Sequence, residues 1–422
     1  MKWMLTLLPV IAFSQDTRNV TEPKIPPVCT TLNANLTAPL RDADESKLDT
    51  VRIQNAIDHC AGGHAVEFKA EGSKNAFLAG PVQLRSGVTL LIDKGATVFG
   101  SRNAHDYDID GRCGTVDQRG RGCKPLIGGD GIENAGIMGD GAIDGRGGAK
   151  LIGQKDSWWD LAQEAKVKNQ SQNVPRILVL THAKNFTLYR IALKNSPNFH
   201  VSFNGDGLTA WGVVIDSPKT SRNTDGIDPA NASNVTITHC FIHTGDDQVA
   251  IKAGGSNNPP ATHMTITHNH FYTGHGMSIG SETDAGASAI RVSDLTIDGA
   301  DNGLRIKSNI MRGGLVTDVV YEDVCIQNTK NPIYMDSNYS AASGPTKDKP
   351  PTFTGIILRN VQVLTPGKIT LDGLDDLHQL GMTFDGVNIA PGSQTVEDHA
   401  NIVRRGNATN SCAGRFESMP AR

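Results

Sequence analysis

The chain of 422 residues has a soluble globular composition, with 38% hydrophobic and 20% charged residues. Its formal net charge of −4, with no basic stripe, excludes a nucleic-acid-binding protein. The 45 glycines, against 5% aromatic residues, favour many short strands joined by tight turns.

The N-terminus resembles a secretory signal peptide over residues 1–14. Lys2 precedes an apolar run, Trp3–Phe13, and the small residue Ser14 follows it. The run is too short to span a membrane, and no later segment is apolar enough to do so. We therefore expect a secreted protein without membrane contact, whose mature chain, residues 15–422, folds as one domain.

Seven cysteines suit an exported chain. Cys113 and Cys123 flank a short loop and form a natural local pair, and a bond between Cys29 and Cys60 would tie down the N-terminal segment. The odd count leaves at least one cysteine unpaired.

The first predicted element is a helix over residues 49–60. Val51, Ile53, Ala56 and Ile57 recur there at near-helical spacing. A helix at this point would cap the open N-terminal end of a stack of strands and cover edges that could otherwise pair with another chain.

The rest of the chain repeats a short alternating run rich in Val, Ile and Thr, followed by a polar or Gly-containing turn. The clearest runs start at Phe186, Leu208, Val235, Met264, Ile290, Val319, Ile356 and Met382. These starts lie 22, 27, 29, 26, 29, 37 and 26 residues apart, and the gap of 37 contains an inserted loop, Ser337–Pro351. A period in the twenties without intervening helices is typical of a β-solenoid, and it excludes a propeller and a TIM barrel. We predict an all-β fold, a right-handed parallel β-helix with a short N-terminal capping helix.

Four polar clusters lie among these runs. Asp225, Asp246, His275 and Arg305, one from each cluster, are 21, 29 and 30 residues apart. Because residues one coil apart stack above one another, we expect acids, a histidine and cations in a single column on one face. Asp228, taken alone, is better explained by a structural role at a turn.

Three neighbouring carboxylates suit glycoside hydrolysis, since one must be protonated to donate to the leaving oxygen and another ionised to activate water. Crowding like charges raises at least one pKa. Arg305 and Lys307 point to the same side of a strand, where they suit a bound carboxylate, although simple salt bridges to the acids are the alternative.

The motifs NTDGID, GDDQVAIK, GHGMSIGS and RIKS, in this order, resemble the glycoside hydrolase family of polygalacturonases over roughly residues 80–400. The resemblance implies inverting hydrolysis of polygalacturonate, the backbone of de-esterified pectin, with no metal or other cofactor. It implies that Asp246 is the general acid, that Asp225 and Asp247 position and activate water, and that His275 supports the acid. In an inverting enzyme the acid and base carboxyls are about 6.5–9.5 Å apart, which we expect for Asp246 relative to Asp225 and Asp247.

The same resemblance implies that Arg305 and Lys307 bind the sugar carboxylate, with Tyr339 near the bound sugar and Asn223 among the substrate-binding residues. Gln248 departs from the family pattern, which often has Cys directly after the paired aspartates. We expect the Gln248 side chain to face inward or sideways, outside the chemistry, and we expect the protein to act as a monomer.

The mode of attack has two readings. The modest insertions favour an endo-acting enzyme, and the alternative is an exo-acting one in which the segment Asn103–Lys124 lies over the cleft. A Ca²⁺-dependent pectate lyase would use the acids as cation ligands, but a histidine between acids and cations argues against it. A non-catalytic polysaccharide-binding β-helix would have no use for three acids beside Arg305 and Lys307.

Overall fold

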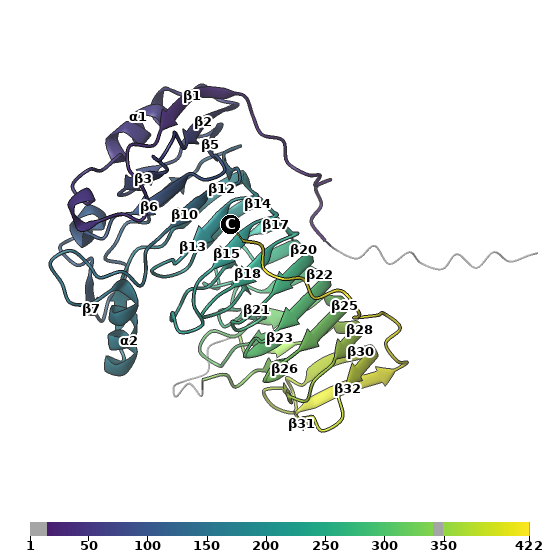
Figure 1. Ribbon diagram of the computed structural model, residues 1–422. Coiled ribbons are helices and arrows are strands. Elements are labelled where there is room, and N and C mark those ends of the chain that lie inside the picture. Colours follow the sequence, from purple (N-terminus) through teal and green to yellow (C-terminus); the bar gives the residue numbers. More distant parts are fainter. Residues whose placement is uncertain (1–14, 341–348, 422) are drawn as a thin grey trace, which may run out of the picture.

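The computed structural model describes residues 15–340 and 349–421 and confirms the predicted fold. Thirty of its strands form one sheet that winds into a right-handed parallel β-helix (Figure 1). The predicted signal peptide, residues 1–14, lies outside the described residues. None of the helices in the described part of the chain has the length and apolar character needed to cross a bilayer.

Each coil contributes strands to three faces, and the longer strands turn the corner from one face to the next. Face 1 contains β1 (Val28–Asn33), β2 (His64–Lys69), β5 (Val88–Ile92), β9 (Gly136–Met138), β12 (Leu178–Tyr189), β14 (Val201–Trp211), β17 (Ser233–Thr238), β20 (Ala261–Phe271), β22 (Ala287–Asp298), β25 (Val319–Gln327), β28 (Ile356–Val363), β30 (Leu380–Ile389) and β32 (Ala400–Arg405).

Face 2 begins with two short strands, continues through the first residues of β12 and β14, and carries the polar motifs. Its strands are β4 (Val82–Gln83), β8 (Ile127–Asp130), β16 (Ile227–Pro229), β19 (Val249–Ile251), β21 (Met277–Gly280), β23 (Asn302–Lys307), β26 (Asn331–Asp336), β29 (Lys368–Asp372) and β31 (Gln394–Asp398).

Face 3 consists of six short strands followed by the last residues of the long strands from β20 to β30. The short strands are β3 (Ala76–Ala79), β6 (Thr97–Gly100), β10 (Ala142–Asp144), β13 (Ala192–Lys194), β15 (Val214–Asp216) and β18 (Phe241–His243). Short strands β24 (Leu315–Val316) and β27 (Thr352–Phe353) pair beside β22, while β7 (Thr115–Asp117) and β11 (Ser171–Asn173) form a separate antiparallel pair.

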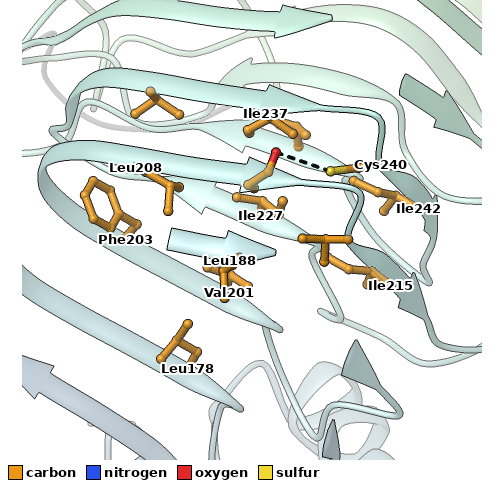
Figure 2. Close-up of a cluster of buried hydrophobic side chains, with 14 of the residues drawn as sticks. Leu178, Leu188, Val201, Phe203, Leu208, Ile215, Ile227, Ile237, Cys240 and Ile242 are labelled. Carbon is orange, nitrogen blue, oxygen red and sulfur yellow. Dashed lines mark hydrogen bonds between the residues drawn. The ribbon is translucent and has the colours of Figure 1, made fainter. Parts of the chain in front are cut away.

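The core fills the inside of the coils with aliphatic side chains stacked in register. One column on face 1 consists of Leu208, Val235, Met264, Ile290, Val319, Ile356 and Met382, all buried. Phe186, the remaining predicted repeat start, is also buried and pairs with Leu208, so all eight starts lie in this column and the sequence period coincides with the structural coil. Figure 2 shows Leu208 and Phe203 in this interior, together with Cys240, a buried free thiol.

Two helices lie toward the N-terminal end of the stack (Figure 1). The predicted helix is α1 (Thr50–His59), which buries Ile53 and Ile57 in the core of the first coils. Including Val51 in its apolar face was wrong, because that side chain is 72% exposed. The second helix, α2 (Trp158–Lys168), was not predicted, although Ser157 caps its first turn and Trp158 packs into the core. Two short 3₁₀ turns, Asp42–Asp44 and Ala104–Tyr107, complete the helical structure of the described chain.

Both ends of the described chain run along the outside of the stack. At the N-terminal end, Thr236 of β17 donates a 2.7 Å hydrogen bond to Asp16, and Tyr189 of β12 donates one to Glu22. At the C-terminal end, the residues after β32 return along the stack (Figure 1). Met419 packs against the cluster of Ala142, Ala192 and Val214 on face 3.

Three disulfides reinforce these arrangements. The predicted Cys29–Cys60 and Cys113–Cys123 bonds are confirmed. The third, Cys325–Cys412, joins β25 to the returning C-terminal segment across 87 residues of sequence.

We expect Leu208→Ala to lower the free energy of unfolding by about 2–5 kcal/mol, because it leaves a cavity in a closely packed column. Leu377→Ala is the matched control, since the Leu377 side chain is 89% exposed, and it should change stability by less than about 0.5 kcal/mol. Denaturant unfolding of both variants checks this. Equal effects would mean that the interior column does not carry the stability of the stack.

Candidate active site

The candidate site lies on face 2, where the turns before β16, β19 and β21 come together. Ile227 pairs with Val249, and Val249 pairs with Met277. The residues two positions before these, Asp225, Asp247 and His275, therefore lie level in successive coils.

This register corrects the predicted column in two places. Asp247, rather than Asp246, is level with Asp225. Arg305 lies further along its strand than predicted, since it pairs with Ser278 of β21. The number of residues per coil varies by several because the turns differ in length. The sequence period therefore predicts the coil in which a residue lies, but not which residue of the next coil is level with it.

Asp247 is held between two cations at the floor of the site. Its Oδ1 accepts hydrogen bonds from Arg305 Nη1 at 3.2 Å and Ser278 Oγ at 2.7 Å, and its Oδ2 accepts one from Lys307 Nζ at 2.8 Å. All three charged side chains are buried. Burial opposes ionisation of Asp247, but Lys307 and Arg305 overcome it and hold the pKa of this carboxyl far below its usual range. Asp247 is therefore ionised at neutral and mildly acidic pH.

Asp246 is partly exposed and forms a pair with His275. Its Oδ1 lies 2.9 Å from His275 Nδ1, and the Asn223 side chain donates a long 3.5 Å hydrogen bond to Oδ2. Burial opposes charge on both partners. Their mutual interaction nevertheless lowers the pKa of Asp246 and raises that of His275. The ligand-free site thus favours a carboxylate beside an imidazolium.

Asp225 and Asp228 share a lysine that sequence reasoning missed. Lys252 Nζ lies 3.6 Å from Asp225 Oδ2 and 3.4 Å from Asp228 Oδ2. Burial and the neighbouring acids raise the pKa of Asp225 well above its usual value, and burial raises the pKa of Asp228 to about 6. Lys252 follows Asp228 by 24 residues, close to one coil, which is the signal that could have identified it.

Tyr339 covers the two cations from the next turn of the stack. Its ring centroid lies 5.1 Å from the Arg305 guanidinium and 5.4 Å from Lys307 Nζ, a cation–π arrangement that leaves the ring half-buried. Gln248 faces inward, as predicted. Its amide donates to the Tyr272 carbonyl at 2.7 Å and accepts a hydrogen bond from the Gly276 amide, so it joins neighbouring coils away from the cleft.

The donors of the site do not suit a bound divalent cation. Asp246, Asp247 and His275 can bring one atom each within 4.8 Å of one another. Both oxygens of Asp247 are already bonded to Arg305, Lys307 and Ser278. A metal ion would therefore have to displace two positive charges, which Coulomb repulsion opposes.

Paired carboxylates in different electrostatic environments, beside a histidine and two buried cations on a parallel β-helix, define a glycoside hydrolase that acts on an acidic sugar polymer. The comparison with known families agrees. The model of Glycosyl hydrolases family 28 matches residues 60–412, and the chain belongs to that family.

Several relatives are similar over most of the chain. The endo-polygalacturonase of Pectobacterium carotovorum subsp. carotovorum is 44% identical over 392 residues, which cover 92% of this chain and 94% of that one. A polygalacturonase of Ralstonia solanacearum is 40% identical, with 83% and 74% covered.

Among solved structures, a polygalacturonase from Erwinia carotovora ssp. carotovora superposes with a TM-score of 0.86 at 43% identity, covering 92% of this chain and all of that one. A family 28 exopolygalacturonase of Yersinia enterocolitica shares the fold, with a TM-score of 0.69 at 22% identity over 90% of this chain.

The shifted pKa of Asp228 makes a prediction about stability. In the folded state Asp228 keeps its proton up to about pH 6, whereas an unfolded Asp loses it near pH 4, so this group makes the fold less stable as pH rises between those values. Relative to wild type, Asp228→Asn should gain up to about 3 kcal/mol of unfolding free energy between pH 4 and pH 7. Denaturant unfolding at both pH values measures this, and a stability difference that is the same at both would contradict it.

Proposed function

We propose that the protein is a secreted endo-polygalacturonase that hydrolyses α-1,4 bonds between galacturonate residues of de-esterified pectin with inversion. One observation carries the proposal: Arg305 and Lys307 lie buried at the base of the site, beside an ionised Asp247 and next to the Asp246–His275 pair. The endo-acting relative from Pectobacterium supports the substrate and the mode of attack.

The two cations would bind the carboxylate of the sugar at the cleavage point. Arg305 offers a planar fork of N–H donors and Lys307 a point charge, and Arg305 Nε has no hydrogen-bond partner within the described residues. The Tyr339 ring lies beside both cations and offers an apolar surface for the sugar.

Asp246 is the proton donor in this proposal. It is the most exposed of the three catalytic carboxyls, with 19% of its side chain accessible, so it can reach the glycosidic oxygen. Its pKa is low in the ligand-free site, which would leave it deprotonated. Binding a uronate carboxylate would offset the positive charge of Arg305 and Lys307, and a second negative charge nearby would raise the pKa of Asp246. Substrate would thus help to protonate its own acid.

Asp247 and Asp225 would hold and activate the attacking water. Asp247 is the ionised partner. Asp225 Oδ1 is buried without a hydrogen-bond partner in the described chain, so a water at that oxygen would supply the missing bond. Attack from this side and proton donation by Asp246 would invert the anomeric carbon, provided the carboxyls are about 6.5–9.5 Å apart.

The decisive assay mixes the protein with polygalacturonate in EDTA. We expect new reducing ends, a rapid fall in viscosity, no ultraviolet absorbance from an unsaturated sugar, and a first product of inverted anomeric configuration by NMR. Asp246→Asn should lose about 10²–10⁴-fold in kcat yet still bind the polymer, because only the proton donor is removed. Asp42→Asn, at a side chain that is 88% exposed, is the control and should change neither.

Other outcomes of this assay would replace the proposal. Monomer or dimer release with little loss of viscosity would indicate exo-attack. Absorbance that appears only with Ca²⁺ would indicate a lyase, and binding without any product would indicate a non-catalytic polysaccharide-binding protein.

The substrate-dependent pKa of Asp246 predicts two different pH profiles. Activity requires protonated Asp246, so it falls as pH rises through the pKa of this group. The profile of kcat/KM reports the free enzyme and that of kcat reports the complex. We therefore expect a mildly acidic optimum in which kcat persists to a higher pH than kcat/KM. Coincident alkaline limbs would contradict the proposed effect of substrate on Asp246.

A further inference from the structure

Lys252 occupies a position on face 2 that parallels the position of Lys307. It directly follows β19, and the register of β19 on β21 carries it level with Gly280, which pairs with Lys307. The two lysines therefore lie in one column, two coils apart, with a glycine between them. Lys307 contacts Asp247, whereas Lys252 lies beside Asp225. Each of the two acids proposed to activate water thus has a lysine of its own.

The backbone and side chain of Lys252 are held in place. Its amide donates a hydrogen bond to the Pro229 carbonyl at 2.9 Å, and its carbonyl accepts one from the Asn231 amide at 2.8 Å. Its Nζ lies 5.1 Å from the centroid of the Phe199 ring, and only 21% of the side chain is exposed. A cation fixed in this way has already lost most of its side-chain freedom, so its ion pairs are stronger than those of a mobile surface lysine.

The two acids proposed to activate water differ in what their oxygens already bind. Both oxygens of Asp247 accept hydrogen bonds, which come from Arg305, Lys307 and Ser278. Asp225 is only 3% exposed, and its Oδ1 has no hydrogen-bond partner in the described chain. Because hydrogen bonds to a carboxylate make it a weaker base, Asp225 is the better acceptor for the proton of the attacking water.

An ionised Asp225 needs a positive charge beside it. The charged groups that act on it are Asp228, Asp246, Asp247, Arg176 and Lys252. Burial and the neighbouring acids raise the pKa of Asp225, and Lys252 lowers it. Among the described cations, Lys252 alone has a nitrogen within 4.0 Å of an Asp225 oxygen, at 3.6 Å. The negative charge of Asp225 therefore depends on Lys252.

Asp228 competes with Asp225 for the same lysine. Its Oδ2 lies 3.4 Å from Lys252 Nζ, and neither of its oxygens has a hydrogen-bond partner within the described residues. One ammonium group cannot neutralise two buried carboxylates, so the pair is most stable with one proton on one of the two acids. When that proton is on Asp228, the whole charge of Lys252 is available to Asp225.

We propose that Lys252 is a positioning residue of the hydrolase, which holds Asp225 ionised to receive the proton of the attacking water while Asp228 carries the proton that the two acids share. In the reaction, the water oxygen bonds to the anomeric carbon and its proton passes to Asp225. The bond from that carbon to the glycosidic oxygen breaks, and Asp246 gives its proton to this oxygen. Asp225 then releases a proton to solvent and Asp246 takes one up, so no co-reactant is needed. This inference rests on the proposed function.

The test compares the pH profiles of kcat on polygalacturonate for three variants. Loss of an opposite charge at this distance raises the pKa of a carboxyl group by about 1–3 units. The optimum lies midway between the pKa of the base and that of the acid, so Lys252→Met should move it about 0.5–1.5 units to higher pH and lower kcat about tenfold or more. Lys252→Arg keeps the charge and should restore the optimum. Asp228→Asn removes the competing acid and should move the optimum the other way, to lower pH.

The position of the optimum does not depend on how much of a variant is folded, so a purely structural role would not move it. Lys184→Met makes the same substitution at a side chain that is 61% exposed and should leave the profile unchanged. An optimum at the wild-type pH in Lys252→Met, or an effect confined to KM, would overturn the role of Lys252 while leaving hydrolysis intact. If Lys252→Met gives no folded protein, Asp228→Asn decides alone, and an optimum that does not move to lower pH would overturn the inference. Failure of the wild-type protein to cleave polygalacturonate would instead overturn the proposed function.

Discussion

The parallel register of the coils is the constraint on which the rest of the molecule depends. Every strand lies about 4.8 Å from the equivalent strand of the next coil, and the register fixes which side chains of the two coils are neighbours. Inside the stack, this forces aliphatic residues such as Leu208 and Val235 into continuous contact. On face 2 the same rule brings Asp225, Asp247 and His275 together, although they are distant in sequence.

Close stacking of ionisable groups creates the differences among the acids. Lys307 and Arg305 lower the pKa of Asp247, whereas burial and the neighbouring acids raise the pKa of Asp225. The residue type does not explain the difference in pKa, since Asp247 and Asp225 are both aspartates in similar turns. The difference depends on which coil contributes the neighbouring cations. Lys252 lies farther from the carboxylates of Asp225 and Asp228 than Arg305 and Lys307 lie from that of Asp247, so its interaction with them is weaker.

The sequence predicted the features that repeat and missed those that do not. Strand spacing indicated the β-helix, and the ordered motifs indicated the acids, His275 and the two cations. The level of each residue within its coil was out of reach, because turn lengths shift the register by a residue or more, and so Asp246 was placed in the column of Asp247. Helix α2 had a local signal in the capping residue Ser157 and in Trp158, but the strand repeat does not predict a helix at this point. The Cys325–Cys412 bond had none, since the path of the returning tail is not encoded in any repeat.

The two outer segments change how the stack can come apart. In a solenoid each coil touches only the coil before and the coil after it, so unravelling can begin at an end and advance one coil at a time. The N-terminal segment bonds to both β12 and β17, and the C-terminal segment reaches from the last coil to the cluster of Ala142, Ala192 and Val214 on face 3. Each of these segments links several coils. A terminal coil therefore cannot unfold until the contacts between the segment and more distant coils have also broken. A stack built from nearest-neighbour contacts thereby unfolds more cooperatively, as a compact domain does.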